Sequence, residues 1–162
     1  MNKEGFGYIP KKGRAAFVQT RTTFVKVNYK AGGRHWVLDS GCTQHMTGDP
    51  NMFSSLEENV VGYSDIIFGD NSRGKVEGVG KIAISNDHSL SNVLLVDSLK
   101  FNLLSVTQFC DHGYKCSFTS DSIDVTSLDG KDQFFKGFRH DTIYLVDFSS
   151  DDAKLTTCLF SK

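Results

Sequence analysis

The residues of this chain best suited to chemistry are Asp39, Ser40 and Gly41, which follow the apolar residues 36–38 directly. An apolar run of this kind indicates a buried strand, so the carboxylate of Asp39 would stand at the end of a rigid element. Ser40 offers a hydroxyl for hydrogen bonding, and Gly41 allows the chain to turn sharply. The alternative is an ordinary strand-to-loop turn, in which the same three residue types are common.

An Asp-Ser-Gly or Asp-Thr-Gly triplet occurs once in the chain, at Asp39. In aspartic protease chemistry two carboxylates about 3 Å apart cannot both ionise, so one acts as base toward water while the other, protonated, polarises a peptide carbonyl. A single triplet supplies only one of these carboxylates. If the triplet is catalytic, we therefore expect a symmetric homodimer in which each Asp39 meets its own copy across the two-fold axis.

Cysteine and histidine residues offer a different kind of site. Cys42 and His45 have the spacing of a zinc-ligand pair, and Cys110, His112 and Cys116 could complete a site in space. The spacings match no paired-ligand pattern, so we expect neither a metal nor another cofactor. His45 is then a polar anchor in the turn, and Cys110 is a small apolar filler on a helix.

The pattern from residue 34 onward predicts an all-β fold. Apolar β-branched and aromatic runs alternate with turn clusters, and the predicted strands are residues 35–38, 66–68, 76–84, 92–96, 114–118, 123–126 and 143–148. Residues 70–74 form a strong turn, so residues 65–84 are predicted to be a long hairpin. Helical spacing of apolar residues predicts one short helix at about residues 102–110. We expect a small closed or nearly closed β-barrel.

The 162 residues indicate one folded domain with flanking segments. We expect a basic, partly ordered leader at 1–33, the domain at 34–148 and a tail at 149–162. The net charge of −1 provides no bulk attraction to nucleic acid, which we do not expect as a partner of the domain. No apolar run reaches the length of a membrane span, and four cysteines without an export signal indicate thiols in the cytoplasm.

Three blocks of sequence resemble a known family. They are WVLDSGCTQHMTGD at 36–49, FGDNSRGK at 68–75 and NVLLVDSLKFNLLSV at 92–106. A triplet with Asp39, a hairpin and then Asn-Leu-Leu before a helix resemble the retroviral protease plan. The blocks themselves are similar to the protease region of plant copia-type retrotransposon polyproteins, and the likeness covers about residues 34–148.

The resemblance implies a retropepsin, a homodimeric aspartic endopeptidase that cuts its own Gag-Pol polyprotein in the cytoplasm or within virus-like particles. Asp39 would be the catalytic residue, Ser40 would hydrogen-bond across the dimer, and Gly41 would let peptide backbone approach. Flap and substrate-binding roles would fall on Phe68, Gly69, Asp70 and Asn71. An extended peptide would bind between this flap and the floor of the site.

The chain departs from the retroviral pattern at three places. Lys100 and Phe101 stand where a glycine usually precedes the helix, the flap tip is polar, and residues 119–148 add C-terminal strands beyond the usual fold. These strands could cover the edge that retroviral dimers use. The departures motivate an alternative function, a non-catalytic β-barrel module of retrotransposon origin that acts in assembly or binding.

Overall fold

A computed structural model describes residues 35–69 and 71–149. The predicted leader and most of the predicted tail lie outside these described residues. The elements in chain order are β1 (His35–Asp39), β2 (Met46–Thr47), a 3₁₀ turn η1 (Pro50–Met52), β3 (Ser55–Glu58), β4 (Ile66–Ile67), β5 (Arg73–Gly74), β6 (Val76–Ala83), β7 (Ser89–Val96), β8 (Asn102–Ser105), α1 (Val106–Asp111), β9 (Tyr114–Phe118), β10 (Ser122–Ser127), β11 (Gln133–His140) and β12 (Ile143–Asp147).

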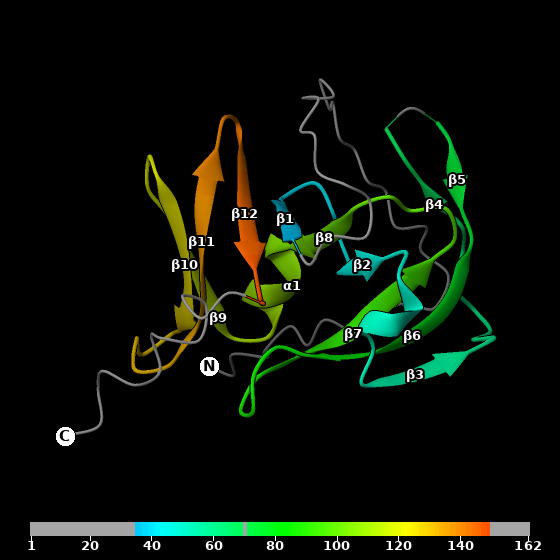
Figure 1. Ribbon diagram of the computed structural model, residues 1–162, viewed down its shortest axis with the longest axis horizontal. Helices are drawn as coiled ribbons and strands as arrows, with labels where there is room; N and C mark the ends of the chain where they lie inside the picture. Colours follow the sequence, from blue (N-terminus) through cyan, green and yellow to red (C-terminus); the bar gives the residue numbers. More distant parts are fainter. Residues whose placement is uncertain (1–34, 70, 150–162) are drawn as a thin grey trace, which may run out of the picture.

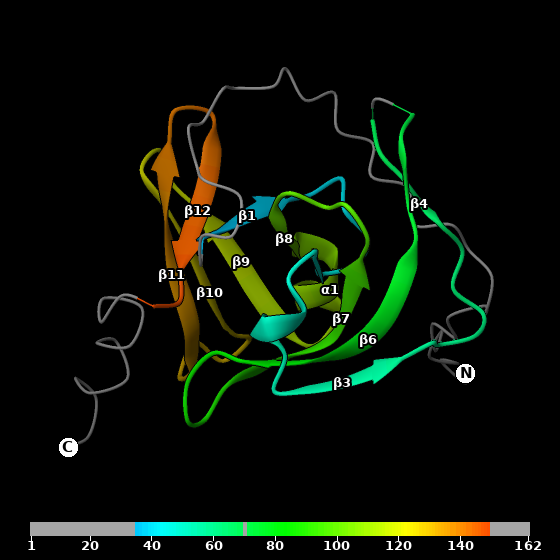
Figure 2. The same cartoon turned by 45° about the vertical axis from the view of Figure 1, so that its right-hand side comes forward.

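Ten of the strands form one curled sheet in the order β3-β6-β7-β2-β8-β1-β12-β11-β10-β9. The two edge strands, β3 and β9, are not paired with each other, so the barrel is nearly closed rather than closed. Figure 1 shows β9–β12 on one side and β3, β6 and β7 on the other, with β1, β2, β8 and α1 between them. The turned view in Figure 2 shows the same arrangement. The prediction of a mainly β, nearly closed barrel with extra C-terminal strands is confirmed.

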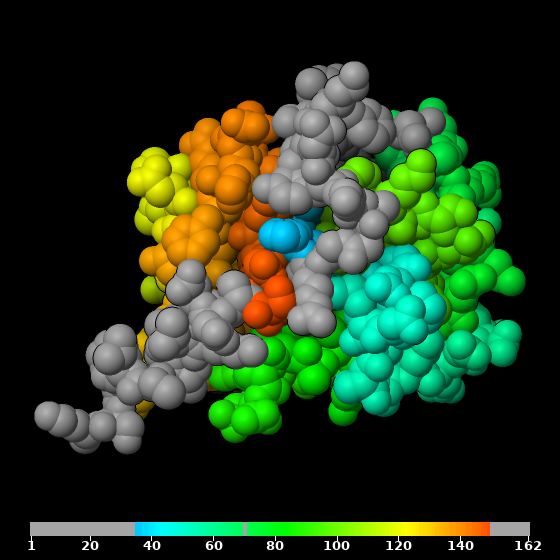
Figure 3. Space-filling view, in the orientation of Figure 1, coloured from blue at the N-terminus to red at the C-terminus, as the bar shows by residue number. Residues whose placement is uncertain are grey.

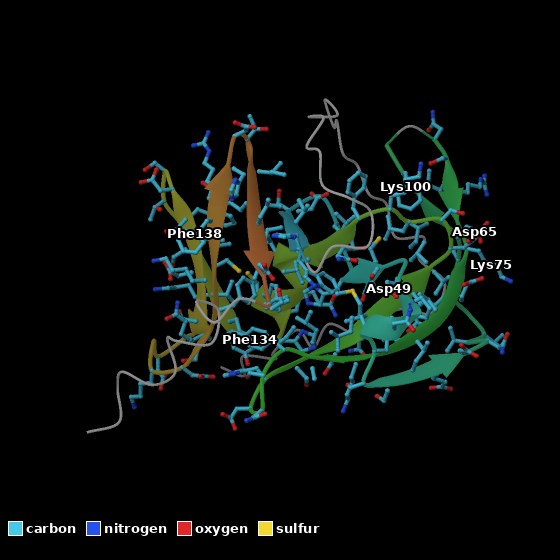
Figure 4. All side chains as sticks on the ribbon, viewed as in Figure 1. Asp49, Asp65, Lys75, Lys100, Phe134 and Phe138 are labelled. Atoms are coloured by element: carbon cyan, nitrogen blue, oxygen red, sulfur yellow. The ribbon has the colours of Figure 1, made fainter. Side chains whose placement is uncertain are left out.

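A side-chain contact joins the two halves of the sheet, which are far apart in strand order. His88, in the turn between β6 and β7, places Nε2 3.1 Å from Oδ2 of Asp132, which lies just before β11. The His88 ring also packs edge-on against Phe134, with the ring centroids 4.9 Å apart. Figure 4 labels Phe134 at the lower part of the β9–β12 unit and Phe138 higher on the same unit. The two turns therefore close the lower side of the curled sheet.

The core consists of two apolar clusters. The larger one contains Trp36 and Leu38 from β1, Leu104 from β8 and Phe109 from α1. The ring of Phe135 packs against that of Phe109. This cluster lies on one face of β1, so buried residues alternate with half-buried residues along the strand. The smaller cluster lies under β2, β4, β6 and β7; its buried members are Cys42, Met46, Ile66, Val76, Leu94 and Val96.

The predicted helix at about 102–110 is half wrong. Asn102–Ser105 form strand β8, which pairs in parallel with β1, and the helix begins only at Val106. The apolar pair Leu103 and Leu104 fits a strand as well as a helix, and the hydrogen bonds offered by β1 decide in favour of the strand. Ser105 then caps the helix, because its Oγ accepts from the Gln108 backbone N–H at 3.1 Å.

The predicted hairpin over residues 65–84 is shorter than expected. Only β4 and β5 pair there, whereas β6 pairs with β3 and β7. Strand β11 was not predicted, because Gly137 and the charged residues around it are typical of a turn. A Cβ on Gly137 would stand 2.8 Å from the Leu145 carbonyl oxygen and 2.9 Å from Ile123 Cγ2, so this glycine allows close strand packing.

Within the described residues, no helix is long and apolar enough to cross a membrane.

Candidate functional site

The Asp39 carboxylate stands at the end of β1, as predicted, and is held by its own loop. Trp36 and Leu38 are buried, Asp39 is half-buried and Ser40 is exposed. The Gly41 backbone N–H donates to Asp39 Oδ1 at 2.7 Å, which fixes one carboxylate oxygen and leaves the other for a second partner. The structure thus brings together the three residues of the predicted active-site triplet. Their catalytic role stays a prediction.

The strands around Asp39 explain why its loop has a defined position. We call residues 40–45, which connect β1 to β2, the Asp39 loop. Strand β8 lies between these two strands, parallel to β1 and antiparallel to β2, so the loop must cross over the end of β8. The last register pair of β1 and β8 joins Asp39 to Ser105. The carboxylate and the start of α1 are therefore neighbours.

Three buried hydrogen bonds hold the Asp39 loop to the beginning of α1. Ser105 Oγ donates to the Cys42 carbonyl oxygen at 2.6 Å, and the Ser105 backbone N–H donates to His45 Nδ1 at 2.9 Å. The His45 backbone N–H donates to Gln108 Oε1 at 2.7 Å. Sequence reasoning missed Ser105 and Gln108. Their only signal was that polar residues interrupt the apolar stretch at 103–109, and Ser105 and Gln108 are both buried.

Burial sets the protonation states of the loop. Burial, and to a lesser degree the charge of His112, lowers the pKa of His45 from 6.5 to about 3, so the imidazole is neutral at neutral pH. Burial, with the charge of Asp39 adding to it, raises the pKa of the Cys42 thiol to about 12, and the thiol donates to the Gln44 carbonyl oxygen at 2.6 Å. Cys42 is consequently an inert, packed thiol.

Two of the residues considered as zinc ligands have other roles, and Cys110, expected to be a small apolar filler, is instead exposed. His45 Nδ1 accepts from Ser105, and Cys42 packs in the smaller core cluster. Among the residues that the structure describes, no group of three or more histidine, cysteine or acidic side chains could hold a metal ion. His45 is a polar anchor, as its position in the turn suggested.

The predicted flap residues lie on the β4–β5 hairpin, apart from the Asp39 loop (Figures 1 and 2). Phe68 is half-buried and packs with the smaller core cluster, next to Gly74. Gly69 and Asn71 are exposed at the tip, where the Asn71 backbone N–H donates to the Phe68 carbonyl oxygen at 2.9 Å. Asp70 lies outside the described residues. In this structure the hairpin presents polar residues and backbone at its tip, while its aromatic ring faces inward.

The fold and the Asp39 loop define a β-barrel domain of the kind found in Pol polyproteins. Residues 36–114 match the family model described as "Pol polyprotein, beta-barrel domain". The match runs from the second residue of β1 to the first residue of β9, so it contains the Asp39 loop, the β4–β5 hairpin and α1.

Two curated proteins of Arabidopsis thaliana are similar to the chain. The retrovirus-related Pol polyprotein from transposon RE1 is 31% identical over 114 residues, which cover 68% of this chain and 8% of that protein. The corresponding polyprotein from transposon RE2 is 28% identical over 131 residues, 78% of this chain and 9% of that protein. The chain thus spans less than a tenth of either relative. No solved structure matches it significantly. The predicted resemblance to retrotransposon polyproteins is confirmed.

Proposed function

We propose that this domain is the aspartic endopeptidase of a retrotransposon polyprotein, active as a homodimer with one Asp39 from each chain. The observation that carries the proposal is the hydrogen bond from the Gly41 backbone N–H to Asp39 Oδ1, at the end of a buried strand. One oxygen of the carboxylate is fixed by this bond, and the residue is still half-exposed. A catalytic carboxylate needs this exposure, because it must reach water and a second carboxylate. The printed names of the relatives, which are Pol polyproteins, add support.

In the dimer Asp39 and Ser40 have separate tasks. One Asp39 carboxylate removes a proton from water, which attacks the peptide carbonyl carbon, and the protonated Asp39 of the second chain donates to the carbonyl oxygen. As the C–N bond breaks, the first Asp39 passes the proton it took from water to the amide nitrogen, and the second Asp39 takes back a hydroxyl proton as the carboxylic acid forms. The exposed Ser40 hydroxyl is free to bond across the two-fold axis and so hold the two loops together. No cofactor is needed for these steps.

The extra C-terminal strands bear on how two copies could meet. Strand β12 pairs with β1 on the side opposite β8, so that edge of β1 is already occupied. In the space-filling view, blue atoms at the start of the described chain reach the surface beside the orange-red β12 (Figure 3). The proposed dimer therefore forms through the Asp39 loops rather than by pairing of β1 edges, and the exposed backbone at Gly69 and Asn71 would cover an extended peptide.

Self-processing of a longer polyprotein precursor tests the proposal. Wild type and Asp39→Asn are expressed in parallel and the products are identified by mass, with Asp121→Asn as a control, since Asp121 is exposed and also precedes a serine. We expect cleavage by the wild type and by the control, and none by Asp39→Asn. Cleavage by Asp39→Asn at the wild-type rate would refute the proposal.

A second candidate function is a non-catalytic β-barrel module that serves assembly or binding. The observation that favours it is the inward packing of Phe68, which leaves a polar hairpin tip instead of an apolar flap. The mass of the chain in solution discriminates between the two. A strict monomer at high protein concentration cannot assemble a site with two aspartates, and together with an uncleaved precursor it would favour the binding module.

A further inference from the structure

We infer that His45 is a positioning residue for Asp39: its imidazole ties the far end of the Asp39 loop to the cap of α1 and thereby sets where the carboxylate stands. The inference rests on the proposed function for its catalytic consequence. Its structural part, the tie itself, can be tested without any catalytic activity.

Three atoms of His45 are engaged at once. The side-chain Nδ1 accepts from the Ser105 backbone N–H, the main-chain N–H donates to Gln108 Oε1, and the main-chain oxygen accepts from the Leu94 N–H at 2.9 Å. The residue is only 3% exposed, and its ring lies 4.6 Å from the ring of Phe109, centroid to centroid. Both the backbone and the ring of His45 are therefore held by elements that do not belong to the Asp39 loop.

The hydrogen bond at Nδ1 explains why a polar residue, His45, occupies a buried position. The Ser105 backbone N–H lies in the interior and needs an acceptor, because an unpaired buried donor is destabilising. A neutral imidazole supplies that acceptor only in the tautomer with its proton on Nε2. An asparagine could place its Oδ1 at nearly the same point, whereas a leucine would fill the space and leave the donor unpaired.

A short chain of contacts leads from His45 to the carboxylate. Ser105, whose backbone bonds to His45, also donates from its Oγ to the Cys42 carbonyl oxygen. Cys42 follows Gly41, whose N–H donates to Asp39 Oδ1. Loss of the acceptor at His45 would release Ser105 and, with it, the backbone that holds Asp39. Because two carboxylates must meet within about 3 Å, a small displacement is enough to uncouple them.

The test compares His45→Asn, which keeps an acceptor, with His45→Leu, which removes it; His140→Asn at the exposed end of β11 is the control. Amide hydrogen exchange is measured on the full chain at Ser105 and Gly41, and kcat and KM for precursor cleavage are measured separately. For His45→Leu we expect exchange at both amides to be at least about tenfold faster and kcat to fall by about a hundredfold with little change in KM. His45→Asn and the control should stay close to wild type in both measurements.

The possible results separate the inference from the proposed function. Wild-type exchange at Ser105 and Gly41 in His45→Leu would overturn the inference. If His45→Leu does not fold, the folded His45→Asn variant decides. Protection of its Ser105 and Gly41 amides from hydrogen exchange supports the tie. Wild-type kcat without that protection overturns it. If the wild-type precursor is not cleaved, the proposed function fails, while faster exchange in His45→Leu alone would still support the tie.

Discussion

Asp39 and Ser105 lie opposite each other as the last register pair of the parallel strands β1 and β8. One strand ends in a half-buried carboxylate and the other in the cap of a helix, and the Asp39 loop leaves the first strand and crosses over the end of the second. The local order of the candidate site therefore depends on Ser105 as much as on the triplet itself.

Ser105→Ala should destabilise the domain. The substitution removes the helix cap and leaves the buried Cys42 carbonyl oxygen without its donor, and the expected loss is about 2 kcal/mol of unfolding free energy. Urea denaturation measures this loss. Ser64→Ala, at an exposed position before β4, should change the unfolding free energy by less than about 0.5 kcal/mol. Equal midpoints for the two variants would contradict the role given to Ser105.

His45 should make the domain less stable in acid. Burial first, and the charge of His112 second, lowers the pKa of His45 in the folded state to about 3, against 6.5 in the unfolded chain. Between these values the unfolded state binds more protons, so stability rises with pH across this window and is fully present above about pH 6.5. Each pH unit below that value costs up to about 1.4 kcal/mol.

The comparison of wild type with His45→Asn isolates this contribution. Both are unfolded with urea at several pH values from 4 to 7, and the unfolding free energy of the wild type should fall relative to that of His45→Asn as the pH falls, since only the wild type carries the ionisable imidazole. A difference that is constant across the window would show that His45 does not titrate with folding.

The cysteines should differ in reactivity. Cys110 is exposed, whereas burial raises the pKa of the Cys42 thiol to about 12, so a neutral-pH alkylating reagent should modify Cys110 first and Cys42 only after unfolding. Peptide mass analysis before and after addition of urea measures the extent of modification at each of the two cysteines. Modification of Cys42 in the folded protein as fast as Cys110 would mean that the Asp39 loop opens readily.

Gly137→Ala should weaken the C-terminal part of the sheet. A Cβ at this position would stand 2.8 Å from the Leu145 carbonyl oxygen and 2.9 Å from Val146 Cγ2, so β11 and β12 would have to separate slightly, at an expected cost of about 1–3 kcal/mol. Thermal unfolding measures this loss as a lower unfolding temperature of the variant. Lys115→Ala, exposed on β9, is the matched control and should unfold near the wild-type temperature. A more stable Gly137→Ala variant would indicate that the strands already stand further apart.

Local patterns in the sequence were sufficient for the class of fold and for the first residue of the site. The apolar run before Asp39 predicted a buried strand that ends in a carboxylate, and the alternation of short apolar runs and turns predicted a nearly closed β-barrel. Both predictions use only residues that are near each other in sequence, because side-chain alternation along a strand is a property of the strand itself.

The tertiary structure alone decided where β8 ends and α1 begins, and which polar groups hold the Asp39 loop. Residues 102–105 suit a helix or a strand, and pairing with β1 selects the strand. Ser105 and Gln108 meet Cys42 and His45 across 60 to 63 residues of sequence. Such partners are brought together by the strand order and by the burial of polar groups that need each other, and neither leaves a periodic signal in the sequence.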